Sequence, residues 1–197
     1  GEEKVSLTAA PALTNGTIGT WAVIQGAGSS HAANYAGMSG SDVVAAPYGG
    51  AGDLDSSSGS TVLFDATGTG GTLTANRSVF AFRTDTAVAL GGFTLNVGAA
   101  NSATPGQAGF ILNNGADITG TAGSLLNFGT NVLNVYADDA GVSTIGIPLT
   151  NVRNNIDNTL SNAFTKFGPG TLELGARATF EGGITVNQGT LSLTAAN

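Results

Sequence analysis

The sequence predicts an all-β fold of the β-solenoid type with a loop-rich N-terminal part. Short segments in which apolar and polar residues alternate, the period of half-buried strands, follow one another through most of the chain. Glycine contributes 31 of the 197 residues and often lies at the corners between these segments, where bends need positive backbone angles. A Gly-Thr-Leu motif returns near the C-terminus, as expected if each coil packs against the next.

The first 60 residues are predicted to form the loop-rich part. Alternation is clear at residues 5–10 and 21–24, and Asn15-Gly16 between them is a strong turn signal. Alternation weakens from residue 26 to residue 60, where Gly-rich and Ser-rich loops are interrupted by one predicted strand at residues 42–46. Surface specificity would reside in these loops, since binding residues concentrate on loops carried by a rigid scaffold.

Residues 61–163 are predicted to form the β-coils. The predicted strands are residues 61–65, 72–75, 78–83, 87–90, 93–97, 109–113, 117–119, 125–128, 132–137 and 143–147. Residues 149–163 have some helical character, but their Asn-rich composition favours a loop or an irregular strand. At about 20 residues per coil, the chain from residue 61 onward would make roughly six or seven coils. Phenylalanines at strand positions are expected to stack in the interior: Phe80, Phe82, Phe110, Phe128 and Phe180.

Residues 164–193 contain the clearest repeat. Gly170-Thr171-Leu172 returns as Gly189-Thr190-Leu191, and a second leucine follows two positions later in both copies. Ile184 and Val186 show the same alternation between the two copies. We therefore expect three short strands separated by glycine-containing bends, which is what one coil of a solenoid requires.

This stretch resembles the autotransporter-associated β-strand repeat, also called the passenger-associated transport repeat. The matching residues are Thr165, Lys166, Gly168, Gly170, Thr171, Leu172, Leu174, Phe180, Gly182, Thr185, Val186, Gly189, Thr190 and Leu191. Phe164 stands where the family usually has Leu, and residues 175–178 replace its usual Ser-Gly-x-Asn turn. Residues 18–22 and Tyr35 more weakly resemble a stretch found upstream of such repeats. The resemblance implies a right-handed parallel β-helix, secreted or on the bacterial cell surface, and it implies no catalytic residue.

Composition favours one extracellular domain spanning residues 1–197. Only 10% of the residues are charged, against roughly a quarter in an average soluble protein, and the net charge is −7. This charge leaves no basic footprint for nucleic acid and no polybasic patch for a membrane. The chain has no Cys, which removes disulfides and thiolate sites, and no apolar run approaches the length of a membrane span. We expect no nucleic-acid partner, no membrane insertion and no cofactor.

The two ends of the chain have nearly the same sequence, because residues 5–10 are VSLTAA and residues 191–196 are LSLTAA. An exposed solenoid end leaves unpaired backbone groups and an uncovered apolar layer, which proteins cap or pair. We predict head-to-tail assembly by strand addition, with self-assembly contacts from Val5, Leu7, Leu191 and Leu193. Two alternatives remain: a larger unit repeated in tandem in a longer protein, and a chance match.

Two polar groupings in the N-terminal part could suggest chemistry. His31 follows Ser29-Ser30, with Asp42 downstream, but no nucleophile elbow surrounds either serine. Asp53 and Asp55 have the alternate spacing of calcium ligands, but the loop lacks the glycine and the bidentate acid that such a loop needs. Solvated loop carboxylates are the favoured interpretation, so no metal site is assigned.

A third grouping follows a predicted strand. Asp138-Asp139 resembles the acids that parallel β-helix polysaccharide-cleaving enzymes gather on one face. Arg153 and Arg177 are the only nearby basic residues in sequence, and no second acid pair lies one coil away. We favour a polar turn and assign no catalytic residue.

The sequence therefore favours a non-catalytic extracellular structural protein, either a subunit of a surface filament or one unit of a long autotransporter-type passenger. Its partners would be copies of itself or adjoining repeats of the same chain. A second hypothesis is an adhesin or carbohydrate-binding passenger, in which the loops of residues 26–60 bind surface glycans and Trp21 and Tyr35 stack on them. A third is a polysaccharide-cleaving β-helix enzyme.

Overall fold

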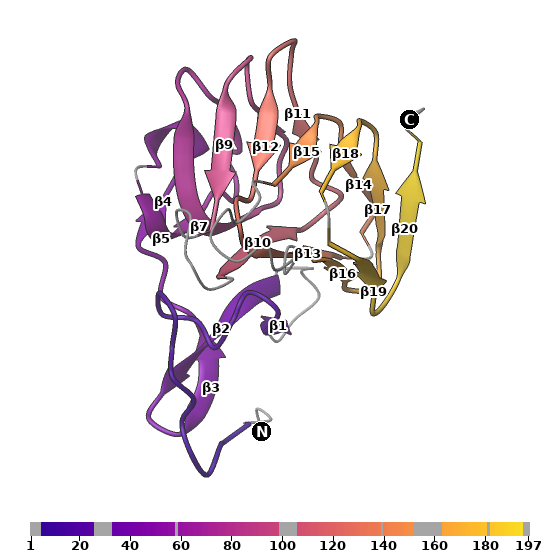
Figure 1. Ribbon diagram of the computed structural model, residues 1–197. Helices are drawn as coiled ribbons and strands as arrows, with labels where there is room; N and C mark the ends of the chain where they lie inside the picture. The colour runs from indigo at the N-terminus through magenta and orange to yellow at the C-terminus, as the bar shows by residue number, and fades with distance from the viewer. Residues whose placement is uncertain are drawn as a thin grey trace.

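The computed structural model describes residues 5–25, 33–57, 59–98, 106–138, 140–151, 163–180 and 182–194 (Figure 1). These residues form strands and one 3₁₀ helix, η1. The elements are β1 (Val23–Gln25), β2 (Ala33–Ser39), β3 (Asp42–Ala45), β4 (Gly50–Ala51), η1 (Leu54–Ser56), β5 (Gly59–Asp65), β6 (Gly71–Thr72), β7 (Arg77–Thr84), β8 (Val88–Ala89), β9 (Thr94–Val97), β10 (Gln107–Leu112), β11 (Ile118–Thr119), β12 (Leu125–Asn127), β13 (Val132–Ala137), β14 (Val142–Ile145), β15 (Leu149–Thr150), β16 (Phe164–Phe167), β17 (Thr171–Leu174), β18 (Ala178–Thr179), β19 (Ile184–Val186) and β20 (Thr190–Leu193).

From β4 onward the chain winds into a coil of parallel strands with three faces (Figure 1). Face A is formed by β4, β5, β7, β10, β13, β16 and β19, and face B by β6, β8, β11, β14, β17 and β20. Face C is formed by the first half of β7 with β9, β12, β15 and β18. This architecture is the predicted parallel β-helix.

Successive coils stack in register, but their lengths differ. Face B holds six strands, one per coil, which agrees with the predicted number. The coils scatter around the predicted length of about 20 residues, because hydrogen-bonded neighbours on adjacent coils lie 18 residues apart at Asp65 and Arg83 and 31 apart at Asn96 and Asn127. The ladder keeps its register between β9 and β12 although this coil is longer, whereas a bulge between Gly59 and Leu63 shifts the register of β5 against β7.

The interior of the coil is a continuous apolar core. Residues one coil apart meet there; Phe82 lies beside Phe110 with a ring-centroid distance of 4.9 Å, and Leu95 pairs with Leu126. All four side chains are at most 2% exposed. Each such side chain contributes about 1.5–3 kcal/mol when it is removed from water. The predicted interior stack is confirmed for three phenylalanines, Phe82, Phe110 and Phe128, and Phe180 packs partly buried against it.

Phe80 corrects that prediction, because it belongs to a second core on the outside of the coil. The strand β7 bends there: Arg77–Val79 pair with β9 on face C, and the pairing with β10 on face A starts at Ala81. The bend interrupts the alternation, so that both Phe80 and Ala81 face outward. A period-two pattern cannot show this, since it assumes a straight strand.

The second core lies between the outer side of face A and a separate antiparallel sheet of β1, β2 and β3 (Figure 1). Ala33, Tyr35 and Ala46 from the N-terminal part pack on Ile111 and Tyr136 of the coil, among others. The region predicted as loop therefore contains the strand β2. Its sequence, ANYAGMS, is rich in small residues, and the strand is stabilised by pairing on both edges and by burial against face A rather than by propensity.

A glycine on face A allows this close approach. A Cβ on Gly109 would lie 2.7 Å from Thr20 Cβ and 2.8 Å from the Tyr35 hydroxyl, which is closer than real side chains come. The N-terminal sheet can therefore dock on β10 only if this position lacks a side chain.

We predict that Gly109→Ala loosens the N-terminal sheet while the coil remains folded. The clash should destabilise the docked sheet by about 1–3 kcal/mol, the usual cost of overpacking. Limited proteolysis should cleave residues 5–48 faster and leave the rest resistant. Gly146→Ala is the matched control, since a Cβ there meets its nearest atom at 3.7 Å. Equal cleavage rates for the two variants would contradict the prediction.

Candidate functional site

The candidate site is one end of the solenoid, because the apolar interior is covered at one end and exposed at the other. At the N-terminal end η1 and β4 close the apolar interior of the first coil, although β4 and β6 are themselves edge strands of their sheets. Leu54 of η1 is fully buried and its N–H donates to the Gly70 carbonyl at 3.1 Å. Gly50 of β4 leaves room for the Phe64 ring, which a side chain would displace. The exposed large apolar residues of the described chain include none from this coil.

Asp53 and Asp55 belong to this closed end. The Asp53 carboxylate accepts a hydrogen bond from the Asp55 N–H and begins η1. The Asp55 carboxylate accepts from the N–H and hydroxyl of Thr74 at 2.8 and 2.6 Å and from Arg77 Nε at 2.9 Å. The hydrogen bond from Arg77, followed by those from Thr74, lowers the pKa of Asp55. The two acids therefore cap and brace the first coil. The described part of the chain holds no group of three or more His, Cys, Asp or Glu side chains placed to bind a metal.

The C-terminal end is open. Ile184 and Val186 of β19 occupy the same register positions as Phe164 and Lys166 of β16, and Leu193 of β20 that of Leu174. These positions point into the coil, yet Ile184, Val186 and Leu193 are 47%, 45% and 60% exposed. Their counterparts one coil earlier are at most 2% exposed. The exposure therefore arises because none of the described residues covers the last coil.

The last coil surrounds an apolar hollow of about 200 Å³. All of its lining residues are apolar or glycine: Leu174, Ala176, Ala178, Phe180, Gly182, Ile184 and Leu193. The strands β18, β19 and β20 are the terminal strands of their sheets, so among the described residues each has a partner on one side only. Such an end offers both an apolar surface and unpaired backbone groups.

The predicted assembly residues do not form two matching ends. Leu191 and Leu193 lie at the open end, where Leu191 is half-buried. Val5 and Leu7 lie elsewhere: Ser6 forms an antiparallel bridge with Asp42, and Leu7 N–H donates to the Ser41 carbonyl at 2.8 Å. The chain start therefore adds to the β3 edge of the N-terminal sheet, away from either end of the coil (Figure 1). Tertiary packing thus gives the two similar sequences different partners within the chain, and assembly between chains through these residues stays a prediction.

The two predicted ligand contacts have different environments. Tyr35 is fully buried, which raises its pKa well above the usual value, and its hydroxyl donates to the Phe82 carbonyl at 3.3 Å. This burial corrects the prediction that Tyr35 stacks on a ligand at the surface. Trp21 is 58% exposed and remains available to solvent.

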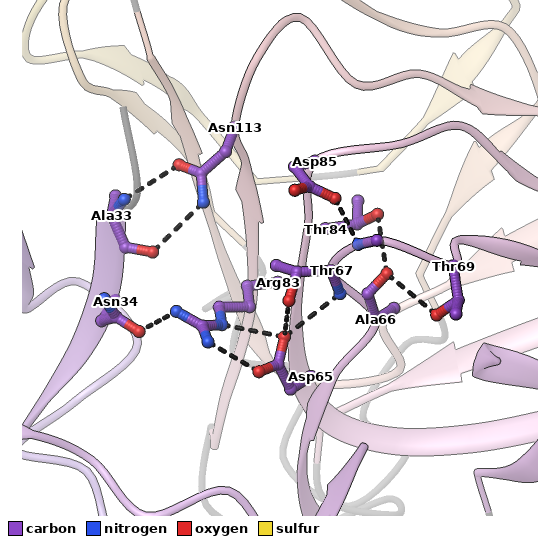
Figure 2. Close-up of polar contacts among 11 residues, drawn as sticks. Ala33, Asn34, Asp65, Ala66, Thr67, Thr69, Arg83, Thr84, Asp85 and Asn113 are labelled. Carbon is purple, nitrogen blue, oxygen red and sulfur yellow. Dashed lines mark hydrogen bonds and ion pairs between the residues drawn. The ribbon is translucent and has the colours of Figure 1, made fainter. Parts of the chain in front are cut away.

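A polar cluster fastens the N-terminal sheet to face A (Figure 2). Arg83 of β7 donates from Nε and Nη2 to the Asp65 carboxylate at 2.9 and 2.6 Å, and its other terminal nitrogen donates to Asn34 of β2. Asn113 bonds the main chain of Ala33 in both directions, donating at 3.2 Å and accepting at 3.1 Å. These bonds join residues far apart in sequence and position β2 on the coil.

Asp138 is a structural residue of a corner. It is 1% exposed, and its carboxylate accepts from the N–H groups of Asn114 at 2.6 Å and Ala140 at 3.2 Å. The same arrangement recurs where the Asp85 carboxylate accepts from Gly68 N–H at 2.6 Å. Both acids thus tie their own coil to the preceding one. His31, Asp139 and Arg153 lie outside the described residues.

The repeat found in the sequence ends at the open end. Residues 164–193 match the family model of the passenger-associated-transport-repeat. They comprise β16 to β20 and thus the last coil with the strands beneath it. Such repeats are generally non-catalytic and occur in secreted autotransporter passengers. The chain shows no significant similarity to a curated protein or to a solved structure. Within the described ranges, no helix is long and apolar enough to span a membrane.

Lys166 is the residue of this region whose role the sequence analysis missed. It belongs to the matched motif, and it also occupies an inward position, two residues after Phe164, in a chain with only six basic residues. A charged residue in the apolar phase of a strand was the signal that could have found it.

We predict that acid weakens the docking of the N-terminal sheet. Although burial raises the pKa of Asp65, hydrogen bonds from Arg83 and Thr67 outweigh it and hold the pKa below its usual value of about 4. Its contribution is therefore present above pH 4 and is lost as the pH falls through the lowered folded-state pKa. Proteolysis of residues 5–48 with an acid-active protease should accelerate below about pH 4.

Asp65→Asn provides the comparison. This substitution removes the charge at every pH. The N-terminal sheet of the variant should therefore dock more weakly by about 1–3 kcal/mol at neutral pH, and its docking should change less in acid. Parallel acid profiles for the two proteins would mean that Asp65 does not carry the effect.

Proposed function

We propose that the chain is a non-catalytic, extracellular structural domain that closes a β-solenoid at its N-terminal end and is continued at its C-terminal end by a further parallel β-coil. The observation that carries the proposal is the exposure of Ile184, Val186 and Leu193 at inward register positions. The secreted location rests on the matched repeat.

The open end fits a coil better than any other occupant. The side chains that line its hollow are all apolar, and its rim is a set of strand edges that a parallel strand can extend. A further coil would bury the exposed side chains of β19 and β20 in the same register in which these two strands cover β16 and β17. Stability of such arrays comes mainly from these contacts between neighbouring coils.

The asymmetry of the ends favours one unit of a long passenger over a subunit of a head-to-tail filament. A head-to-tail contact needs two complementary open ends to propagate. Here η1 and β4 close one end, and residues 5–7 pair with the N-terminal sheet. We therefore assign the continuing contact to the last coil alone, with Leu191 and Leu193 in it.

Extending the chain by one coil tests the proposal. Leu193 has the register position of Leu174, so a copy of residues 175–193 attached directly after Leu193 supplies one coil. Amide hydrogen exchange in Ile184–Val186 and Thr190–Leu193 should slow about tenfold or more, because these strands become internal. Unchanged exchange there would overturn the proposal.

Matched substitutions within the appended copy identify the contact. Ile184→Asp with Leu191→Asp places charges on its inward side and should abolish the added protection. Thr185→Asp with Ser192→Asp places the same charges on the outward side of the same strands and should preserve it. Equal protection with both pairs would show that the appended residues do not dock as a coil.

Trp21 supports a second candidate, glycan binding by the N-terminal part, because its indole is largely exposed beside a rigid sheet. Binding on a glycan array that Trp21→Ala abolishes and Leu13→Ala, at another exposed apolar residue, retains would favour it. The enzyme hypothesis gains no such support, since Asp138 is buried and each of its carboxylate oxygens accepts a hydrogen bond from a backbone N–H group.

A further inference from the structure

Lys166 is a fully buried cation held by main-chain carbonyls. Its ammonium donates to the carbonyl oxygens of Gly168 at 2.6 Å, Gly170 at 2.5 Å and Gln188 at 2.9 Å. An ammonium group has three donors, and this arrangement gives each an acceptor. Burying a charge is costly unless it is fully hydrogen-bonded, so the three carbonyls compensate for the loss of water.

The three carbonyls come from two different coils. Gly168 and Gly170 lie in the turn between β16 and β17, whereas Gln188 lies in the equivalent turn between β19 and β20. The cage therefore spans the junction between the last coil and the one before it. Elsewhere the same corner is tied by acids that accept from N–H groups, such as Asp85 and Asp138. At this junction the polarity is reversed, with a cation joining carbonyls.

Glycines build the cage. Gly168 and Gly189 have φ angles of +84° and +72°, which residues with a side chain rarely adopt. A Cβ on Gly189 would collide with the Lys166 ammonium and with the carbonyl oxygens of Gly168 and Gly170. A Cβ on Gly170 would collide with the Asp138 carbonyl of the preceding coil. One lysine and three glycines of the matched repeat thus serve a single structure.

We propose that the turns at Gly168–Gly170 and Gln188 form a binding site for a primary ammonium group, filled by the chain's own Lys166, and that this site latches the last coil to the solenoid. The inference goes beyond the proposed continuation of the coil, since it concerns how β19 and β20 are held whether or not another coil covers them. These strands bury little of their apolar side chains, so the latch adds to the backbone pairing with β16 and β17 that also attaches them.

Lys166→Met removes the donors while keeping most of the volume of the side chain. At about pH 6 the folded-state ammonium is charged, because burial lowers its pKa only to about 8. We expect hydrogen exchange at the amides of Asn187, Thr190 and Thr194, which bond to the preceding coil, to accelerate about tenfold or more. Exchange in β10 and β13 should not change. Wild-type exchange in the last coil of Lys166→Met would overturn the proposal.

Chemical rescue identifies the ligand class. Lys166→Ala lacks the atoms that n-propylammonium would supply, so millimolar n-propylammonium should restore slow exchange in the last coil. Tetramethylammonium, which has no N–H donor, and n-propanol, which has no charge, should not restore it. Rescue by all three compounds would indicate filling of a cavity, and rescue by none would refute a separable ammonium site; either result overturns the assignment of the ligand.

A glycine pair checks the cage by a second route. Gly189→Ala should reproduce the exchange of Lys166→Met, because the new methyl group occupies the space of the ammonium. Gly183→Ala lies on the same coil, where a Cβ would have no atom within 4 Å, and should leave exchange unchanged. Equal exchange in the two variants would contradict the cage.

Discussion

Each coil of this solenoid can bury its inward side chains only against a neighbouring coil, and the rest of the structure follows from that constraint. Register is kept from Phe82 to Phe110 although the coils differ in length, because a shift of one residue would turn every inward side chain outward. The same constraint leaves a problem at both ends, where one neighbour is missing.

Polar side chains add a second set of ties between coils. Backbone ladders satisfy the strands, but the corners leave N–H and C=O groups that need partners. Asp85 and Asp138 accept from N–H groups of the preceding coil, and Lys166 donates to carbonyls of its own coil and the next. These buried or half-buried groups fix the path of the chain at positions where apolar packing alone is not directional.

The outer side of face A is used as well as the inner side. The N-terminal sheet covers it with a second core around Tyr35, and Arg83 joins Asp65 of the coil to Asn34 of the sheet (Figure 2). Face A is thus buried on both sides over part of its length, and its strands lose the simple alternation of a half-buried sheet. The closed first coil and the open last coil make the two ends of the domain different, and the N-terminal sheet covers one face between them.

The sequence by itself determined the class of fold and most coil strands, from residues 132–137 to the repeat at 164–193, because alternation and glycine corners are local properties. It also placed Leu191 and Leu193 on an inward strand face. Only the tertiary structure decided that residues 5–7 and 191–193 have different partners, that Tyr35 is buried, and that Lys166 is caged. Each of these depends on contacts between segments distant in sequence, which a periodic pattern does not encode.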